Sequence, residues 1–185
     1  MHARIDTELG PVVFRLETRA APRTCAYMAE IVASGAWDGA SFFRIVAADN
    51  AQWRKETPIE LVQGGLRDTD PQPVAPVDHE GTDVTGLTHR RGTVSAARYG
   101  PKETYGSFFI CMRDEPALDC GGARHPDGRG FAAFGQVADG FNVVQSIFNR
   151  RSGTEFVERP VRIISACLVA HEADANPSDG RSIAT

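Results

Sequence analysis

Three short segments of the sequence carry side chains whose chemistry suits a binding or catalytic site. Arg44 interrupts the apolar run 41–46, Gln63 precedes a glycine pair, and Phe109 closes an aromatic pair. An arginine keeps its proton in proteins, so Arg44 can donate hydrogen bonds and stabilise developing negative charge but cannot act as a general acid or base. If the three segments are neighbouring strands, these side chains form a groove that is cationic, amide-bearing and apolar. The residues alone also allow an ordinary alternative, in which the arginine stem packs and its head reaches solvent or a carboxylate.

Motifs for other kinds of catalytic or metal site are missing. No Gly-x-Ser-x-Gly motif occurs, and Ser95, which we expect on a strand, has no recognisable base beside it, so a hydrolase is disfavoured. Cys111, Cys120 and His125 do not match the ligand spacing of a zinc site, and we expect His125 to lie in a turn. The run 128–130 precedes a strand and lacks the third glycine of a dinucleotide-binding loop. We therefore expect no metal and no cofactor.

Composition limits the class of protein. With 185 residues, 42% of them hydrophobic, the chain is long enough for one domain with a real core. A net charge of −4 gives no basic surface for nucleic acid, and no window approaches the ~18 apolar residues of a membrane-spanning helix. The first residues contain no apolar stretch typical of a secretory signal. We expect a monomeric cytoplasmic protein, or a periplasmic one if a signal was removed before numbering began.

The four cysteines form no Cys-x-x-Cys pair. Cys25, Cys111 and Cys167 lie in apolar runs, and we expect them to be buried as small hydrophobic residues. Cys120 lies in a glycine-containing loop, where we expect an exposed thiol. Four reduced cysteines are compatible with a cytoplasmic setting.

Hydrophobic periodicity predicts a β-rich fold. A helix should start near Pro22 and end at Gly35, and a second should follow residues 139–140. We expect an exposed loop over 47–58, and longer irregular segments over 67–86 and 114–129. Strands are predicted over residues 4–8, 12–17, 42–46, 61–65, 92–97, 108–112, 131–137 and 161–169. About eight strands and two helices indicate a barrel or sandwich with helical caps over residues 1–171, followed by a flexible tail over 172–185.

The order of four motifs resembles the cyclophilin family of peptidyl-prolyl cis–trans isomerases, and its bacterial members fit best. These motifs are Phe-x-Arg at 42–44, Gln-Gly-Gly at 63–65, Phe-Phe-Ile at 108–110 and Phe-Gly-x-Val at 134–137. The resemblance extends from about Arg4 to Val169. It implies an all-β-dominated fold, a closed eight-stranded antiparallel β-barrel capped by two α-helices, which agrees with the independent strand count. It also implies an isomerase that assists protein folding by acting on proline-containing peptides and unfolded proteins.

The resemblance also implies a set of site residues. Arg44 would stabilise the twisted amide, Gln63 would hydrogen-bond the substrate backbone, and Phe109 would form the floor of a proline pocket. Further substrate-binding positions implied in the same way are Phe42, Leu61, Ala97, Arg98, Ser107, Leu118 and Phe131. Loops 47–58 and 119–130 are longer than in compact members and would flank the groove.

Two other functions stay open at the level of sequence. One is a module that binds proline-containing segments in the same groove without catalysis, and the other is a barrel whose groove has no function. Ala117 stands where the family often has an aromatic residue, which makes tight cyclosporin binding doubtful, and this altered rim favours the binding module. Retention of Arg44 favours the isomerase, because binding alone does not need a group that acts on the transition state.

Overall fold

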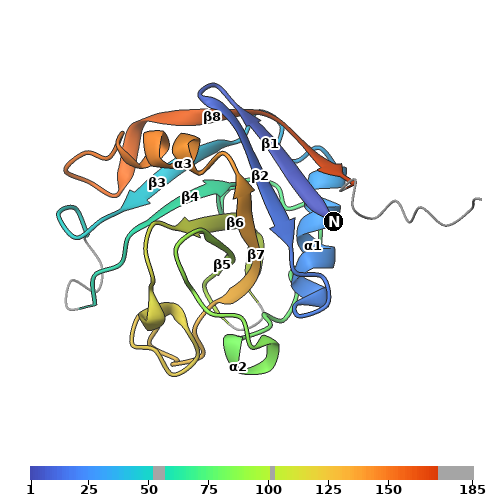
Figure 1. The fold of residues 1–185 in the computed structure, drawn as a ribbon, viewed down its shortest axis with the longest axis vertical. Coiled ribbons are helices and arrows are strands. Elements are labelled where there is room, and N and C mark those ends of the chain that lie inside the picture. The colour runs from blue at the N-terminus through green and yellow to red at the C-terminus, as the bar shows by residue number, and fades with distance from the viewer. Residues whose placement is uncertain (52–56, 101–102, 171–185) are drawn as a thin grey trace, which may run out of the picture.

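The computed structural model describes residues 1–51, 57–100 and 103–170, which form a closed β-barrel (Figure 1). The strands of the described ranges follow one another around the barrel in the order β1-β2-β7-β5-β6-β4-β3-β8, and the pairs are antiparallel. They are β1 (His2–Thr7), β2 (Gly10–Leu16), β3 (Ser41–Val46), β4 (Leu61–Gly65), β5 (Thr93–Arg98), β6 (Thr104–Cys111), β7 (Ala132–Asp139) and β8 (Phe156–Val169). Closure pairs each strand on both sides, so the barrel exposes no strand edge. The predicted eight-stranded antiparallel barrel is confirmed.

Two helices lie on opposite sides of the barrel in Figure 1. They are α1 (Pro22–Ala33) and α3 (Phe141–Phe148), and both were predicted. The structure adds a single helical turn, α2 (Thr82–Thr85), and a 3-10 turn, η1 (Pro116–Leu118). Elements this short escaped the sequence analysis because three or four residues cannot display a helical period.

The first turn of α1 is capped by a residue from a distant part of the chain. The N-cap residue Ala21 has no side-chain acceptor to offer the free N–H groups of that turn. Instead, the carboxylate of Glu80 accepts hydrogen bonds from the Thr24 N–H at 2.7 Å and from the Thr24 hydroxyl at 2.8 Å. Burial would raise the pKa of Glu80, but the hydrogen bonds from Thr24 and Arg23 outweigh it and lower the pKa. The irregular segment 67–86 is therefore fastened to α1.

Phe108 lies at the centre of the barrel interior. Its ring centroid is 5.3 Å from that of Phe14, 4.6 Å from Trp37 and 5.5 Å from Phe42. Because successive side chains of a strand point to opposite faces, Phe109 points out of the barrel. It joins a second apolar cluster on the outer side with Val46, Ala51, Ile59, Leu61, Cys111 and Leu118. The barrel wall thus separates an interior core from an outer apolar surface.

The glycine pair after Gln63 permits close packing at the end of β4. A Cβ atom on Gly64 would lie 2.8 Å from the ring of Phe42. Gly65 has a φ of +94°, and a Cβ there would lie 2.6 Å from the carbonyl oxygen of Gly106. The same carbonyl accepts a hydrogen bond from the Trp37 indole at 2.8 Å. A larger residue at Gly64 would push against Phe42 of β3, and one at Gly65 would force β4 and β6 apart.

A β-bulge in β3 determines which side chains leave the barrel interior. Phe42 pairs with Gly64 and Arg44 pairs with Gln63, so Phe43 is an extra residue on β3. In a regular strand Phe43 and Arg44 would point to opposite faces. The bulge turns both of them to the outer side, while Phe42 stays in the core.

A larger irregularity occurs in β8 opposite the same point. Between Phe42 and Arg44 β3 advances by two residues, whereas their partners on β8, Val161 and Phe156, are five residues apart. The extra residues include Pro160, which cannot donate a ladder hydrogen bond and fits at such an interruption. This proline made the first part of β8 unrecognisable in the sequence, so the strand begins five residues before its predicted start.

Two further sequence-based expectations were wrong in part. Cys167 is exposed, because the register of β8 against β1 shifts between Ile163 and Ser165, so that Ala166 and not Cys167 packs against the core. Cys25 and Cys111 are buried and Cys120 is exposed, as expected. β6 begins at Thr104 rather than at Phe108, since its polar first half carries no apolar alternation.

The loop that follows β3 was expected to be exposed, but its first residues are buried. Ala47, Asn50 and Ala51 are less than a tenth exposed. The side chain of Asn50 accepts a hydrogen bond from the Ala47 N–H and donates to the carbonyl oxygens of Ser152 and Thr154 at 3.2 and 3.1 Å. Asn50 therefore ties this loop to the segment before β8. Residues 52–56 and the predicted tail 172–185 lie outside the described residues.

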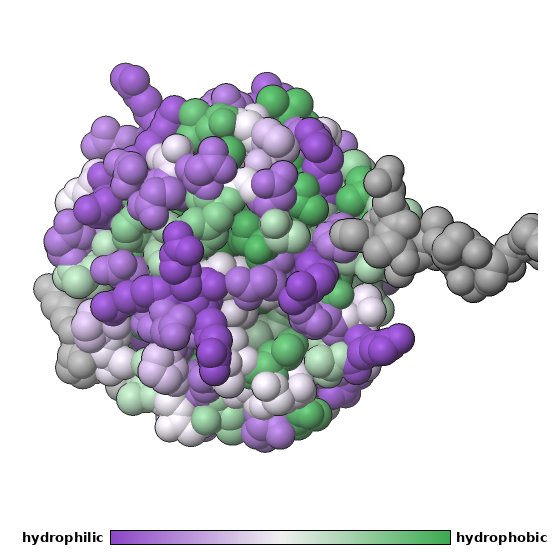
Figure 2. Space-filling view, in the orientation of Figure 1, coloured by the Kyte–Doolittle hydropathy of each residue, from purple (hydrophilic) through white to green (hydrophobic). Residues whose placement is uncertain are grey.

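The surface seen in Figure 2 is mixed, with hydrophobic residues in separate patches between hydrophilic ones. None of the helices in the described ranges has the length and apolar character needed to cross a membrane. The large aromatic side chains discussed above lie inside the barrel or beneath a pocket on its outer wall.

Candidate active site

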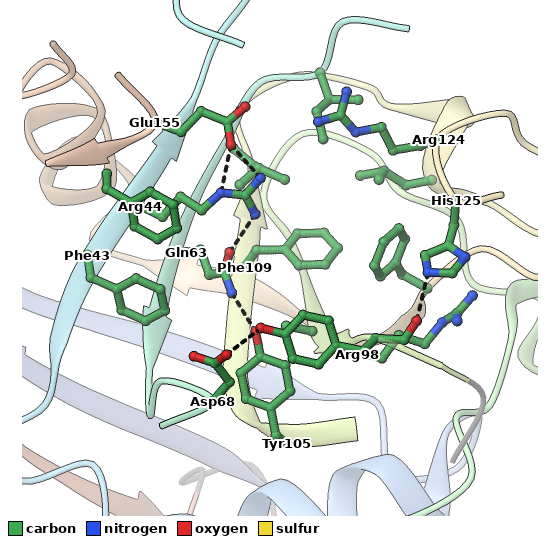
Figure 3. A pocket seen from close by; sticks show the side chains of 17 residues that line it. Phe43, Arg44, Gln63, Asp68, Arg98, Tyr105, Phe109, Arg124, His125 and Glu155 are labelled. Carbon is green, nitrogen blue, oxygen red and sulfur yellow. Dashed lines mark hydrogen bonds and ion pairs between the residues drawn. The ribbon is translucent and has the colours of Figure 1, made fainter. Parts of the chain in front are cut away.

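A pocket of about 510 Å³ lies on the outer wall of the barrel, where β3, β4 and β6 meet the segment after β5 and the loop 119–130 (Figure 3). Its volume falls in the range typical of small-ligand sites. The apolar part of the lining consists of Phe43, Ile59, Leu61, Ala97, Phe109, Leu118, Phe131 and Phe156. In Figure 3, Arg44 and His125 lie on opposite sides with Phe109 between them. The pocket therefore combines an apolar floor with polar walls.

Most of the site residues predicted from the sequence line this pocket. They are Arg44, Leu61, Gln63, Ala97, Arg98, Phe109, Leu118 and Phe131. Two others do not line it and are corrections. Phe42 is 1% exposed in the barrel interior, because the bulge brings Phe43 to the pocket in its place. Ser107 is fully buried behind Gln63, so its hydroxyl supports that side chain and does not face the pocket.

Arg44 is held at the pocket wall by two neighbours. Its Nε and Nη2 donate hydrogen bonds to one carboxylate oxygen of Glu155 at 2.9 and 2.6 Å. Its Nη1 donates to the side-chain oxygen of Gln63 at 2.9 Å. A guanidinium has five N–H donors, so these three bonds leave two N–H groups without a partner among the described residues. The side chain is 24% exposed, which leaves the guanidinium within reach of a ligand.

Gln63 links the arginine to the opposite end of the polar wall. Its amide nitrogen donates to the hydroxyl of Ser107 at 3.0 Å and to that of Tyr105 at 3.2 Å. Both amide hydrogens and one lone pair of the amide oxygen are therefore used within the protein. The expectation that Gln63 contacts a substrate backbone stays a prediction, but its observed partners make it a bridge between Arg44 and Tyr105.

Phe109 forms the floor and is packed from two sides. Phe131 meets it edge to face with ring centroids 5.4 Å apart, and the ring of His89 stacks against it at 5.9 Å. His89 in turn approaches Ser95 Oγ at 2.9 Å through Nε2 and Asp119 Oδ1 at 2.7 Å through Nδ1. The expectation that Ser95 has no base beside it is therefore wrong.

This Ser95–His89–Asp119 arrangement has the connectivity of a hydrolase triad but cannot serve as one. Ser95 has no exposed surface and does not line the pocket, so a substrate carbonyl cannot reach its hydroxyl. The hydrogen bonds instead tie the start of the loop 119–130 to β5 beneath Phe109. A hydrolase was disfavoured by the sequence, and burial now excludes Ser95 as its nucleophile.

Arg98 lines the same pocket, and its guanidinium uses four of its five N–H groups in hydrogen bonds within the protein. It forms a bidentate pair with the two carboxylate oxygens of Asp127 at 2.9 and 3.0 Å, and it also donates to the carbonyl oxygen of Gly130. Its side chain has no exposed surface. The hydrogen bonds from Arg98 hold the pKa of Asp127 well below its usual range. Arg98 thus holds the loop 119–130 against the barrel.

Two tyrosines complete the polar wall and were not predicted as site residues. Tyr99 and Tyr105 stack with ring centroids 5.3 Å apart, and the Tyr99 hydroxyl donates to Asp68 at 2.9 Å. Burial raises the pKa of Tyr105, although its hydrogen bond with Gln63 opposes this shift. Its phenol is therefore neutral at pH 7 and can accept the hydrogen bond from Gln63.

Sequence reasoning missed several other lining residues, chiefly Phe43, Glu155, Phe156, Arg124 and His125. The unusual length of the loop 119–130 was the available signal for Arg124 and His125. Glu155 and Phe156 carried no such signal, because they lie more than a hundred residues from Arg44. No group of three or more potential metal-ligating side chains (His, Cys, Asp or Glu) occurs within the described parts of the chain.

Most of the chain resembles known proteins of one family. Residues 2–168 match the family model described as cyclophilin type peptidyl-prolyl cis-trans isomerase/CLD. The peptidyl-prolyl cis-trans isomerase cyp18 of Streptomyces antibioticus is 30% identical over 154 residues, which cover 81% of this chain and 84% of that protein. Peptidyl-prolyl cis-trans isomerase A of Dickeya dadantii is 31% identical over 150 residues, covering 79% and 70%.

A solved structure supports the same fold. The crystal structure of a Cryptosporidium parvum cyclophilin type peptidyl-prolyl cis-trans isomerase, in the presence of the dipeptide Ala-Pro, matches 92% of this chain and 100% of its own with a TM-score of 0.74 and 20% identity. The family match spans nearly all of the described barrel, and bacterial proteins are among the relatives. The chain belongs to the cyclophilin-type peptidyl-prolyl cis-trans isomerase family.

Proposed function

We propose that this chain catalyses rotation about X–Pro peptide bonds in proline-containing peptides and unfolded proteins, with Arg44 stabilising the twisted amide. One observation carries the proposal: Arg44 presents two N–H groups without a partner among the described residues, beside an apolar floor. A prolyl ring is apolar and compact, so the floor formed by Phe109, Leu118 and Phe131 suits it.

The chemistry requires no acid, base or metal. Rotation about the amide bond has a barrier of ~18–20 kcal/mol because it breaks the resonance of the planar amide. In the twisted state the prolyl nitrogen regains its lone pair and becomes a hydrogen-bond acceptor. A guanidinium N–H placed beside that nitrogen binds the twisted state more strongly than either planar isomer. Only such a difference in binding accelerates the reaction.

The backbone of Ala97 offers a way to hold the substrate chain. Ala97 has no partner residue in the pairing of β5 with β6, whose register shifts between Ala96 and Arg98. The pairing of β5 with β7 ends one residue earlier, at Ala96. Ala97 lines the pocket, so its peptide groups can pair with an extended segment, as in strand-addition recognition. We assign Ala97 to backbone recognition, and we assign Gln63 chiefly to holding Arg44.

The test is an isomerisation assay on short X–Pro peptides, in which a protease cleaves only the trans form. Wild type should accelerate isomerisation, and Arg44→Ala should lower kcat/KM by about 100-fold or more, as for loss of one oxyanion-hole donor. Arg44→Lys should recover only part of the rate, because an ammonium lacks the planar fork.

A wild-type protein that is no faster than buffer across several residues before proline would contradict the isomerase. Binding of the same peptides, followed by NMR shifts of the pocket residues, would then identify the alternative, a non-catalytic module using this groove. Activity that survives Arg44→Ala would contradict the mechanism and leave the activity standing.

A further inference from the structure

We infer that Glu155 is a positioning residue for Arg44: its carboxylate fixes the plane of the guanidinium so that the two remaining N–H groups face the reacting bond. This inference rests on the proposed function of the pocket. It concerns a residue that carries no family motif in the sequence and that lies 111 positions from the arginine.

The contact constrains orientation as well as distance. One carboxylate oxygen of Glu155 accepts from both Nε and Nη2 of Arg44, which engages one complete edge of the planar group. Gln63 engages Nη1. Bonds to all three nitrogens leave the guanidinium no free rotation. With Gln63 alone, one nitrogen would be fixed and the long arginine side chain could turn about that contact.

Glu155 is itself held firmly. It is 3% exposed, and its carbonyl oxygen accepts a ladder hydrogen bond from the Ile45 N–H at 2.8 Å. The carbonyl oxygen of the preceding residue, Thr154, accepts from Asn50, and the Thr154 hydroxyl donates to the carbonyl oxygen of Phe156. The interruption in β8 described above brings this anchored segment over β3. Bulges of this kind often redirect side chains beside active sites.

Three substitutions separate position from charge. Glu155→Gln keeps an oxygen at the same reach without the charge, and should leave kcat/KM within about threefold of wild type. Glu155→Asp keeps the charge but withdraws it by one methylene, about 1 Å, and should cost about tenfold. Glu155→Ala removes the contact and should cost about 30-fold or more, since misplacement of a catalytic group by about 1 Å can cost up to ~100-fold.

A double-mutant cycle tests whether Glu155 acts through the arginine. Adding Glu155→Ala to Arg44→Ala should change kcat/KM by no more than about twofold, because the group to be positioned is already absent. A further loss comparable to that of the single variant would overturn the inference.

The Nε–H signal of Arg44 in ¹H–¹⁵N NMR gives a readout that does not depend on activity. It is identified by its absence in Arg44→Ala. It should exchange slowly with water in wild type and in Glu155→Gln, and rapidly in Glu155→Ala. Equally rapid exchange in wild type and Glu155→Ala would overturn the inference even if the isomerase assay failed. If the assay succeeds, a second result would also overturn the inference. Glu155→Asp would be nearly as active as wild type and Glu155→Gln as impaired as Glu155→Ala, which would show that the charge of residue 155 matters and the position of its oxygen does not.

Glu80→Gln is the matched control. Glu80 is also a buried carboxylate, 4% exposed, and it also contacts an arginine, but it caps α1 and does not line the pocket. This variant should lower the melting temperature while leaving kcat/KM and the Arg44 Nε–H exchange unchanged. A loss of activity in Glu80→Gln equal to that of Glu155→Ala would mean that general destabilisation, not positioning, explains the effect, and would overturn the inference.

Discussion

Two arginines line the same pocket but differ in burial and in how many of their N–H groups the protein itself engages. Arg98 has a fully buried side chain, a bidentate contact to Asp127 and a further acceptor in Gly130. Arg44 is 24% exposed and keeps two donors beyond those used by Glu155 and Gln63. Each guanidinium also lies near an aromatic ring of the pocket, at 5.3 and 5.9 Å respectively.

The difference shows how one residue type serves two purposes in a single site. A fully buried arginine with four of its five N–H groups bonded to its own protein stabilises the fold but offers little to a ligand. An arginine held along one edge keeps its orientation and still offers hydrogen bonds. The pairing pattern, more than the presence of an arginine in the pocket, separates the proposed catalytic group from the structural one.

The largest effect expected from this comparison is on stability. Arg98→Ala should lower the free energy of unfolding by about 2–4 kcal/mol, because it leaves the buried carbonyl oxygen of Gly130 unpaired and removes a partly buried ion pair. Its kcat/KM, measured where the variant is folded, should fall less than tenfold, far less than in Arg44→Ala. Urea unfolding together with the isomerisation assay checks both quantities. A variant as stable as wild type but nearly inactive would reverse the assignment of the two arginines.

Removing the support that Gln63 gives to Arg44 should lower kcat/KM by an intermediate amount. Gln63→Ala removes the acceptor for Nη1 and should lower kcat/KM by about tenfold. Ser107→Ala removes a hydroxyl that holds Gln63 from behind and should cost about threefold. Steady-state kinetics at a temperature well below unfolding measures both. If Ser107→Ala were the more damaging of the two, Gln63 would not be the bridge described here.

The ion pair between Arg98 and Asp127 also predicts that the stability of the fold depends on pH. Because the pKa of Asp127 is lowered in the folded protein, its contribution to stability is present above the unfolded pKa of about 4 and is lost as the pH falls below that value. Asp127→Asn should therefore be less stable than wild type at pH 7 but lose stability less steeply between about pH 5 and pH 2. Chemical denaturation at several pH values gives the slopes. Parallel slopes would contradict this role.

The smallest effect should come from the aromatic neighbour of Arg44. Phe156 is 57% exposed, so its ring contributes only a weak cation–π contact. Phe156→Leu should lower kcat/KM by about two- to fivefold, with an unchanged melting temperature. Phe131→Leu, which alters the pocket wall beside Arg98, should act mainly by raising KM. A loss of about 50-fold in Phe156→Leu would show that the ring, and not Glu155, orients the guanidinium.

Local sequence patterns were enough to predict the barrel and the central residues of the site, Arg44, Gln63 and Phe109. Alternating apolar residues identified the strands, and the motifs around Arg44, Gln63 and Phe109 placed them on strands that do meet. These features are encoded in residues close together in the chain, where periodicity and glycine positions have a direct physical meaning.

The features that could not be predicted depend on register between distant segments. The family resemblance placed Phe42 among the substrate-binding positions, but a bulge at Phe43, which leaves no signature in the sequence, brings Phe43 to the pocket instead. Glu155 precedes a strand whose first half was hidden by Pro160. The base beside Ser95 comes from His89, whose side chain meets it only when the segment before β5 folds back. In each case the folded arrangement of neighbouring segments, and not a local sequence pattern, sets the contact.

The capping of α1 by Glu80 has a consequence for the order of folding. The first turn of the helix acquires acceptors for Thr24 only when a residue 56 positions later arrives, after β3 and β4 have been traversed. A helix of 12 residues is marginal by itself in water. Its N-terminal turn should therefore become protected against hydrogen exchange late, together with the segment before β5, although helices usually form early. In this protein a local element is completed by a non-local contact, so protection of the first helical turn reports when the segment 67–86 docks against α1.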